Sequence, residues 1–443
     1  MTELKQYRIE AASAAELVGA VESALADAAL TPGQRLPSVR RLALEVGLSP
    51  VTVAAAIAEL RRRGVVVTEP RRGTRIAERP PIGASGPPLP VPPGARDLSL
   101  GNPDPALLPD LGRALARADL PVRLYGEPAA LAELVELARA RLSADGIDGG
   151  SLCIVSGALD GIERVIEAHL RPGDRVAVEN PGYASLFHLL RARGLRLEPV
   201  AIDERGMRPE ALGAALARGA SAAIVTPRGQ NPTGAALDAR RAAELRAVLD
   251  GAPGTLVVED DHLGEVAGAQ LHTTLAGRER WAATRSVAKA LGPDLRLAVL
   301  AGDAQTVARV QGRQQCGPGW VSHILQRLVL ELWRDPAVLA LVQRAPVTYA
   351  SRREHLLRAL ADRSIHAVGA SGLNVWAPVQ DETSTVGALL QRGWVVAPGA
   401  PFRLAGGPGA IRITIAALQE AEAARLADDL ADALGAAPAA RAG

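Results

Sequence analysis

Lysine is nearly absent from this chain, so the single lysine in its second half is informative. Among the 50 basic residues only Lys5 and Lys289 are lysines, and the others are arginines. A lysine, unlike an arginine, carries an amine that can lose its proton and attack a carbonyl carbon. Lys289 lies among small and apolar residues in RSVAKALGPDLRL, residues 285–297. Two interpretations are open on this observation alone: an amine that forms a Schiff base, or a surface lysine.

Residues suited to one cofactor follow several short apolar runs of the chain. Asp260 ends TLVVED, Asn231 lies in TPRGQNPTG, and Tyr183 lies in ENPGYAS. Residues 155–165, VSGALDGIERV, lead from small residues into a helix, and the first amides of a helix can bind phosphate. Pyridoxal phosphate (PLP) requires an amine for its aldehyde and a carboxylate for its pyridinium nitrogen. An amide donor, an aromatic ring to stack and a phosphate cradle complete the set, so the combination predicts a PLP site around Lys289.

These residues need a scaffold that brings distant strand ends together. Strand-like runs at 175–180 (RVAVEN), 222–227 (AAIVTP) and 255–260 (TLVVED) alternate with helical stretches such as Asp238–Asp250. This alternation predicts an α/β fold, in which a mostly parallel sheet has helices on both faces. Ligands of such sheets bind at the carboxyl ends of the strands, which is where the candidate residues stand.

A proline-rich segment divides the chain. Residues 79–96, RPPIGASGPPLPVPPGAR, contain seven prolines, which exclude a helix or a central strand and favour an extended connector. We therefore predict a head over residues 1–78, a linker over 79–96 and a body over 97–443.

The composition is that of a globular protein, with 48% hydrophobic and 22% charged residues. The N-terminus lacks a signal-peptide pattern, and no run of roughly eighteen apolar residues occurs, so we expect a cytoplasmic protein without a membrane partner. Cys153 and Cys316 show no metal-ligand spacing. We expect them to be buried apolar side chains, and we predict no metal site.

The head combines helix signals with a local excess of positive charge. Ala11–Ala29 has apolar residues at helical spacing, and Ser38 and Ser49 are placed to cap two further helices. The short β-prone runs Val65–Thr68 and Thr74–Ala77 follow. The stretch from Arg35 to Arg75 contains nine arginines and three glutamates, a net charge of +6. A basic helix-turn-helix favours DNA binding, and a helical oligomerisation domain is the alternative.

Residues 35–76 resemble the winged helix-turn-helix of GntR regulators. The matching motifs are LPSVRRLA, GLSPVTV and the GT of the wing tip. The resemblance implies contacts to double-stranded operator DNA from Arg40, Ser49, Thr52, Arg71, Arg72 and Gly73. The recognition helix departs from the family in having Pro50 and Ala54 where arginines are usual. We therefore expect the recognition helix to make few base-specific contacts, mainly to thymine methyl groups and through single hydrogen bonds.

The body resembles the fold-type I aminotransferases over nearly all of residues 97–430. Five segments fall in the family's order: YGEPAALAELVELAR, GDRVAVENPGY, QNPTG, SVAKALGPDLRL and AIRITIAAL. The resemblance implies that Lys289 holds PLP as a Schiff base, that Asp260 pairs with the pyridinium nitrogen and that Asn231 approaches the ring oxygen. It implies stacking by Tyr183, an α-carboxylate contact from Arg412 and a smaller C-terminal α+β subdomain. Further implied cofactor contacts come from His262, the Ala158 and Leu159 amides, Ser286, Arg296 and, from a partner subunit, Tyr125.

Two residues depart from the aminotransferase pattern. His262 stands where tyrosine is usual, and because imidazole titrates near neutrality we expect a pH-sensitive site. Ala288 replaces a common serine before Lys289, which removes one phosphate donor. Residues 314–323, QQCGPGWVSH, are expected to form a helix-start turn at a dimer interface, with a wall of the effector pocket as the alternative.

A GntR head, a proline-rich linker and an aminotransferase-like body together resemble the MocR subfamily of transcriptional regulators. The resemblance implies a homodimeric, PLP-dependent DNA-binding regulator. Its body would sense PLP or an amino-acid-like effector through an aldimine at Lys289. Two alternatives remain: an active aminotransferase with a vestigial head, and a DNA-binding protein whose body is only a dimerisation scaffold. The intact basic head disfavours the first and the complete cofactor set disfavours the second, while transaminase half-reactions stay open.

Overall fold

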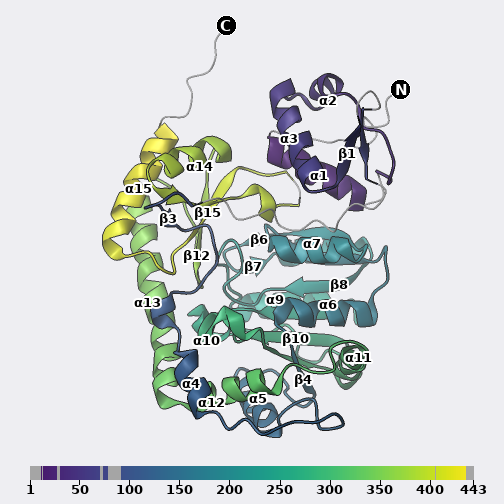
Figure 1. The fold of residues 1–443 in the computed structure, drawn as a ribbon, viewed down its shortest axis with the longest axis vertical. Coiled ribbons are helices and arrows are strands. Elements are labelled where there is room, and N and C mark those ends of the chain that lie inside the picture. The colour runs from purple at the N-terminus through teal and green to yellow at the C-terminus, as the bar shows by residue number, and fades with distance from the viewer. Residues whose placement is uncertain are drawn as a thin grey trace. The chain divides into compact units, whose positions relative to one another are not determined.

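The computed structural model describes residues 11, 13–26, 30–69, 73–77, 91–404 and 406–435 (Figure 1). The chain divides into two compact units, one containing the N-terminal head and the other containing most of the body. Most of the predicted linker lies outside the described residues, as do Arg71 and Arg72.

The head consists of three helices and a two-stranded hairpin, as the sequence predicts. Its elements are α1 (Ala14–Ala26), α2 (Val39–Val46), α3 (Pro50–Arg62), β1 (Val66–Glu69) and β2 (Gly73–Ile76). β1 and β2 pair antiparallel. The elements share one apolar core, which includes Leu17, Leu42, Val53, Leu60 and Ile76.

Two serine caps begin the helices of the helix-turn-helix. Ser38 Oγ accepts a hydrogen bond from the Arg41 amide at 3.4 Å, and Ser49 Oγ accepts one from the Thr52 amide at 3.0 Å. Gly47, with φ of 71°, ends α2 in the left-handed region that glycine adopts without strain. Along the described chain no single helix is long and apolar enough to cross a membrane. Only α2 and α3 taken together meet that test, and they are bent by 112° at their junction.

The body is built on an eight-stranded, mostly parallel sheet in the order β4-β11-β10-β9-β8-β5-β6-β7. β5, β8, β9 and β10 run parallel to one another, whereas β11 is antiparallel to both β10 and β4. The strands are β4 (Leu152–Val155), β5 (Arg175–Asn180), β6 (Arg196–Asp203), β7 (Gly206–Met207), β8 (Ala220–Val225), β9 (Leu256–Asp261), β10 (Trp281–Ser286) and β11 (Ala298–Gly302). The three predicted strands therefore exist, with β8 beginning two residues earlier than expected.

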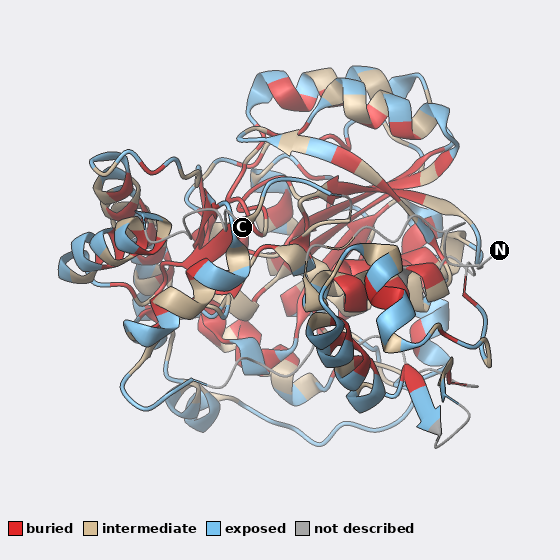
Figure 2. Cartoon of the chain, turned by 90° about the horizontal axis from the view of Figure 1, so that it is seen from above, coloured by how far each residue is buried: buried red, intermediate tan, exposed pale blue. Residues whose placement is uncertain are grey.

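Helices flank this sheet, and its central strands are buried along most of their length (Figure 2). Burial of both faces explains why these strands are continuous apolar runs rather than alternating ones. The helices are α4 (Leu111–Arg117), α5 (Ala132–Ala144), α6 (Ala158–His169), α7 (Ala184–Ala192), α8 (Pro209–Ala217), α9 (Ala239–Asp250), α10 (Ala288–Leu291), α11 (Ala304–Gln315), α12 (His323–Arg334) and α13 (Pro336–Ala361).

A smaller C-terminal subdomain contains a three-stranded antiparallel sheet in the order β12-β15-β14. Its elements are β12 (Asn374–Pro378), α14 (Glu382–Gln391), β13 (Trp394–Val395), β14 (Ala397–Pro398), β15 (Ala410–Thr414) and α15 (Glu420–Gly435). β13 pairs in parallel with β3 (Arg96–Asp97), which begins at the last residue of the predicted linker. The Leu98 carbonyl then accepts a hydrogen bond from the Thr414 amide at 2.9 Å. The first residues after the linker thus belong to the last subdomain of the chain.

Candidate cofactor and effector site

The candidate residues follow neighbouring strands at one edge of the large sheet. Tyr183 comes after β5, Asn231 after β8, Asp260 near the end of β9 and Lys289 after β10. Because these four strands are parallel and adjacent, their carboxyl ends lie along the same edge. The four candidate residues therefore lie along this edge in the order of their strands, β5, β8, β9 and β10.

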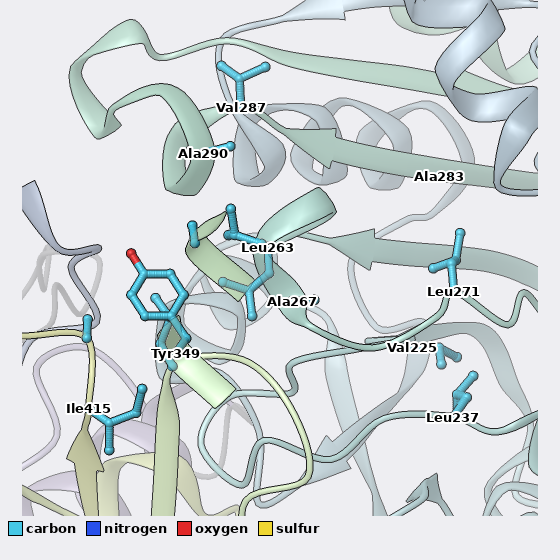
Figure 3. Packing of buried hydrophobic residues seen from close by; sticks show 14 of the residues in the cluster. Val225, Leu237, Leu263, Ala267, Leu271, Ala283, Val287, Ala290, Tyr349 and Ile415 are labelled. Carbon is cyan, nitrogen blue, oxygen red and sulfur yellow. The ribbon is translucent and has the colours of Figure 1, made fainter. Parts of the chain in front are cut away.

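Lys289 lies on the short helix α10, which rests on a tight apolar core. α10 packs on α13 and on the 3-10 turn η3 (Gly264–Ala267). Figure 3 shows members of this core, among them Ala267 and Tyr349. The Lys289 Nζ donates a hydrogen bond to the Gly101 carbonyl. Burial, aided by the positive charge of Arg412, lowers the pKa of Lys289 to about 8, so its amine is far more readily neutral than that of an ordinary lysine.

Asp260 is buried, and no described residue forms an ion pair with it. Thr284 Oγ1, from the adjacent strand, donates a hydrogen bond to Asp260 Oδ1 at 3.3 Å. Burial, together with the negative charge of Asp261, raises the pKa of Asp260 to about 7. Such a carboxylate is stabilised by a cationic N–H donor, which a protonated pyridine ring provides.

Asp261, the next residue, has the opposite environment. Arg228 binds both of its carboxylate oxygens at 2.9 Å, and the Arg285 Nε donates to Oδ2 at 2.8 Å. Arg285 also forms an ion pair with Asp145 at 2.7 Å. Although burial opposes it, this pairing holds the pKa of Asp261 below its usual range. This cluster was not predicted from the sequence. Its signal there is the second aspartate of TLVVEDD, together with one arginine in TPRGQNPTG and one in RSVAKALGPDLRL.

Arg412 lies on β15 and contacts the candidate cofactor residue Asn231. Its Nη1 donates to Asn231 Oδ1 at 3.0 Å, and its Nη2 donates to the Ser99 carbonyl. The guanidinium carbon lies 4.8 Å from the centre of the Phe402 ring. The Nε is buried and has no hydrogen-bond partner among the described residues. Burial lowers the pKa of Arg412 to about 10, so it stays cationic at neutral pH and offers an unused donor.

The N-terminus of α6 and Arg296 lie close together and could bind an anion. α6 begins after Gly157, and no described side chain caps it, so the Ala158 and Leu159 amides lie in the first turn, where amides have no acceptor within the helix. A Cβ added at Gly157 would make a tight contact of 3.1 Å with Arg296 Nη2, and the φ of 105° also favours glycine there. Ser286 Oγ accepts a hydrogen bond from the Ala288 amide at 3.1 Å.

His262 differs from the sequence-based expectation. The side chain is partly buried, and burial together with the positive charge of Lys289 lowers its pKa to about 4. The imidazole is therefore neutral at pH 7, and the expected titration near neutrality is wrong for this site. Buried apolar surroundings and a neighbouring amine, which no sequence pattern reports, account for the difference.

Two further aromatic candidates lie at different depths. Tyr183 is partly buried and lies close enough to Arg412 to influence its pKa. Tyr125 is 93% exposed, and its ring centre lies 5.7 Å from that of Trp320, within the 314–323 segment. Cys316 in the same segment is exposed, which corrects the expectation of a buried thiol, whereas Cys153 is buried as expected.

The DNA-binding candidates lie on the head. Arg40 is exposed and Gly73 has a φ of 83° at the hairpin, while Arg71 and Arg72 lie outside the described residues. Ser49 Oγ lies 2.7 Å from Thr52 Oγ1 in addition to capping α3, so both hydroxyls already have local partners. Val51, beside them, is 79% exposed.

Comparison with known families assigns both parts of the chain. The family described as aminotransferase class I and II matches residues 96–430, and the gntR family of bacterial regulatory proteins matches residues 13–76. The vitamin B6 salvage pathway transcriptional repressor PtsJ of Salmonella typhimurium is 39% identical over 431 residues, which cover 96% of this chain and 99% of PtsJ. The chain belongs to the MocR subfamily of GntR regulators.

Other relatives agree with this assignment. The transcriptional regulator TauR of Rhodobacter capsulatus is 29% identical to this MocR-type regulator, over 84% of this chain and 85% of TauR. Among solved structures, the α-aminoadipate aminotransferase LysN of Thermus thermophilus, complexed with phosphopyridoxyl-leucine, matches 78% of this chain and 93% of its own. The TM-score is 0.69 at 23% identity. The Pyrococcus horikoshii kynurenine aminotransferase matches 79% and 93% with a TM-score of 0.72 at 20% identity.

These likenesses confirm the predicted fold. The body of the MocR-type regulator has the fold-type I aminotransferase architecture, and the head is a GntR-type winged helix-turn-helix. PtsJ and TauR, which match over 96% and 84% of this chain, are transcriptional regulators. The chain is therefore a DNA-binding regulator, and this interpretation is favoured over an aminotransferase with a vestigial head.

Proposed function

We propose that the body binds PLP covalently at Lys289 and that PLP occupancy controls how this regulator binds its operator. The observation that carries the proposal is the pairing of two opposite pKa shifts at one sheet edge. The pKa of the Lys289 amine is lowered to about 8, and that of the buried Asp260 carboxyl is raised to about 7. When bound, PLP supplies an aldehyde to the amine and a protonated ring nitrogen to the carboxylate.

The other residues of the site fit the remaining groups of PLP. The amides of Ala158 and Leu159, with Ser286 and Arg296, offer donors to a phosphate at the start of α6. Asn231 can meet the ring oxygen and Tyr183 can stack on the ring. His262, neutral at pH 7, can donate or accept a hydrogen bond there without adding charge. Tyr125 is proposed to reach the phosphate of the partner subunit.

PLP itself is the proposed effector, with an amino-acid-like ligand as the second candidate. Two relatives are named for vitamin B6 pathways: PtsJ, and the pyridoxine biosynthesis regulator PdxR of Corynebacterium glutamicum, which is 30% identical over 267 residues. Target genes in vitamin B6 supply follow from this likeness. The buried Arg412, with its unpartnered Nε, supports binding of a ligand carboxylate as well.

A homodimer is proposed from the surface around Tyr125. The segment after α4 exposes several large apolar side chains, and the start of α12 adds another: Leu120 (42%), Val122 (87%), Leu124 (69%) and Ile324 (52%). Several large apolar side chains exposed in one segment favour an interface with another protein surface. A second copy covering them would bring two heads to two half-sites on the operator.

The experiment uses the only two lysines of the chain. Holo-protein is reduced with borohydride, digested and analysed by mass spectrometry, with Lys289→Arg as the test variant and Lys5→Arg as its control. We expect a phosphopyridoxyl group on the Lys289 peptide in wild type and in Lys5→Arg, and a colourless Lys289→Arg protein that still folds. Footprints of operator DNA should change on adding PLP to wild type but not to Lys289→Arg. Label on Lys5, or the same PLP response from both variants, would reject the proposal.

A further inference from the structure

Two candidate cofactor residues lie in loops, so the pairing of strands does not fix their positions directly. Tyr183 lies three residues beyond the end of β5, and Asn231 lies in the loop after β8. The strands are neighbours, but the loops extend past the paired residues. Their relative position therefore depends on side chains that cross between them, and two buried polar residues do so.

Gln230 has every hydrogen-bonding group of its side-chain amide engaged. It is fully buried, at 0% exposure. Its Nε2 donates to the Pro181 carbonyl at 2.9 Å and to Glu179 Oε2 at 3.1 Å. Its Oε1 accepts from the amide and the hydroxyl of Thr233, at 3.0 and 2.7 Å. One side chain thus joins the segment before Tyr183 to both sides of Asn231.

Glu179 completes the same connection from the other strand. It is 5% exposed and accepts from the Thr226 amide at 2.9 Å and the Thr226 hydroxyl at 2.8 Å, as well as from Gln230. Burial raises its pKa to about 7, with a smaller contribution from the charge of Asp260, the proposed partner of the ring nitrogen. Buried groups with all partners satisfied allow one arrangement and penalise others.

We propose that Glu179 and Gln230 are positioning residues that set the separation between Tyr183 and Asn231, and thereby the width of the slot for a planar ring. The inference rests on the proposed function, because the ring in question is that of PLP. Neither residue need touch the ligand. They act through the loops that do, in the way that outer-shell partners orient ligands at metal sites.

The chain contains a matched control for the buried acid. Glu259, on β9, is 1% exposed and also accepts three bonds from threonines: the Thr274 amide (2.6 Å), the Thr274 hydroxyl (2.8 Å) and the Thr273 hydroxyl (2.9 Å). Burial raises its pKa to about 7 as well. It binds the 273–274 segment, which carries no candidate cofactor residue. Loss of Glu259 therefore reports on stability alone.

The test compares Glu179→Gln and Gln230→Met with Glu259→Gln in the full-length protein. PLP affinity and the visible absorbance and dichroism of bound PLP are measured in each, beside stability to urea. We expect the first two variants to lose on the order of tenfold or more in PLP affinity and to shift the dichroism, at urea midpoints similar to that of Glu259→Gln. If Glu179→Gln or Glu259→Gln fails to fold, Thr226→Val replaces Glu179→Gln and Thr274→Val replaces Glu259→Gln. Each threonine variant removes one hydroxyl donor to the corresponding glutamate.

Hydrogen exchange in protein without added PLP gives a second readout. Amides of residues 182–183 and 229–234 should exchange faster in Glu179→Gln and Gln230→Met than in Glu259→Gln. Wild-type protein that binds no PLP at Lys289 would reject the proposed function, yet the exchange result would still decide whether the two residues order the loops. If PLP affinity and hydrogen exchange are the same in all three variants, this inference is wrong, whereas the proposed function is unaffected.

Discussion

Arg412 donates a hydrogen bond of 3.0 Å from Nη1 to Oδ1 of Asn231. The residue proposed to bind a ligand carboxylate therefore contacts the residue proposed to meet the PLP ring oxygen, although 181 positions separate them in the chain. A ligand carboxylate that drew the guanidinium toward itself would compete with this bond. We therefore expect binding of such a ligand to change the environment of Asn231.

Arg412→Lys should weaken amino-acid binding while leaving PLP binding nearly unchanged. The substitution keeps the positive charge but loses the planar fork, so we expect amino-acid binding to holo-protein to weaken by about tenfold or more. PLP affinity should change little. Arg425→Lys is the control, because Arg425 also stacks on an aromatic ring, 4.4 Å from the centre of Trp394, but lies on α15. Spectroscopic titrations with amino acids measure both effects, and equal losses in the two variants would contradict the role of Arg412.

Neutralising two adjacent aspartates should have opposite effects on stability. Asp260 has a folded pKa of about 7 against an ordinary 3.8, so its ionisation costs stability as the pH rises from about 4 to about 7. Asp260→Asn should therefore stabilise protein without PLP above pH 7, by at most about 4 kcal/mol at 1.36 kcal/mol per pKa unit. It should also weaken PLP binding. Asp261→Asn leaves Arg228 and Arg285 with Asp145 as their shared acidic partner and should destabilise by about 3–5 kcal/mol. Urea unfolding at pH 5 and pH 8 checks both signs, and the same sign for both variants would be evidence against the assignment.

The rate of PLP capture should report the pKa of Lys289. The neutral amine is the nucleophile, so the rate should rise with pH and level off above about 8, whereas an ordinary lysine amine, with a pKa near 10.5, continues to gain. Removing the charge of Arg412, as in Arg412→Met, should move the profile to higher pH because that charge lowers the Lys289 pKa. Arg296→Met should weaken capture without moving the midpoint. Stopped-flow absorbance across pH 6–11 measures the profiles, and a wild-type midpoint near 10.5 would refute the lowered pKa.

Holo-protein should perform few or no complete transamination cycles. A regulator gains from retaining its effector, so we expect spectral changes with amino acids but no sustained product formation. Mixing holo-protein with a panel of amino acids and a keto-acid acceptor tests this. Turnover at about 1 per second or faster, the range of ordinary enzymes, would support an aminotransferase instead.

Two head variants should distinguish base reading from phosphate contact. Val51 is 79% exposed at the start of α3, so Val51→Ala should weaken binding to operator DNA by about 1 kcal/mol or less, the value of one or two methyl groups. Replacing contacted thymines by uracil should have a similar effect. Arg40→Ala should weaken specific and non-specific DNA alike and flatten the salt dependence. Titrations at several salt concentrations compare the variants, and indifference to uracil would move specificity to the wing.

Local signals made much of this structure predictable. Serine caps, the proline after Ser49 and the continuous apolar strands each act over a few residues. Helices α2 and α3 therefore begin directly after Ser38 and Ser49, and strands β5 and β9 lie within a residue of their expected bounds. The parallel order of strands then implied that Lys289, Asp260 and Asn231 would stand at one edge. Caps and apolar runs of this kind depend only on residues that are close together in the sequence.

What could not be predicted depends on segments that meet only in the folded chain. The contact of Arg412 with Asn231, the pairing of Asp261 with two arginines and the low pKa of His262 all arise from burial and from charges brought together by the fold. Ser49 is a different case. Its cap was predicted, but the bond between its hydroxyl and Thr52 was not, and this bond leaves both side chains less available to DNA.

The strand that carries Arg412 also anchors the chain where it enters the body. Thr414, two residues along β15, donates its amide to Leu98, and β3 before Leu98 is paired to β13 of the same subdomain. The linker therefore enters the body at the C-terminal subdomain, beside the strand that carries Arg412, rather than at the large sheet. If a ligand bound by Arg412 displaced β15, we expect the attachment point of the linker to move with it. In a pair of such chains, the spacing between the two attachment points would set which half-site spacing the heads can span.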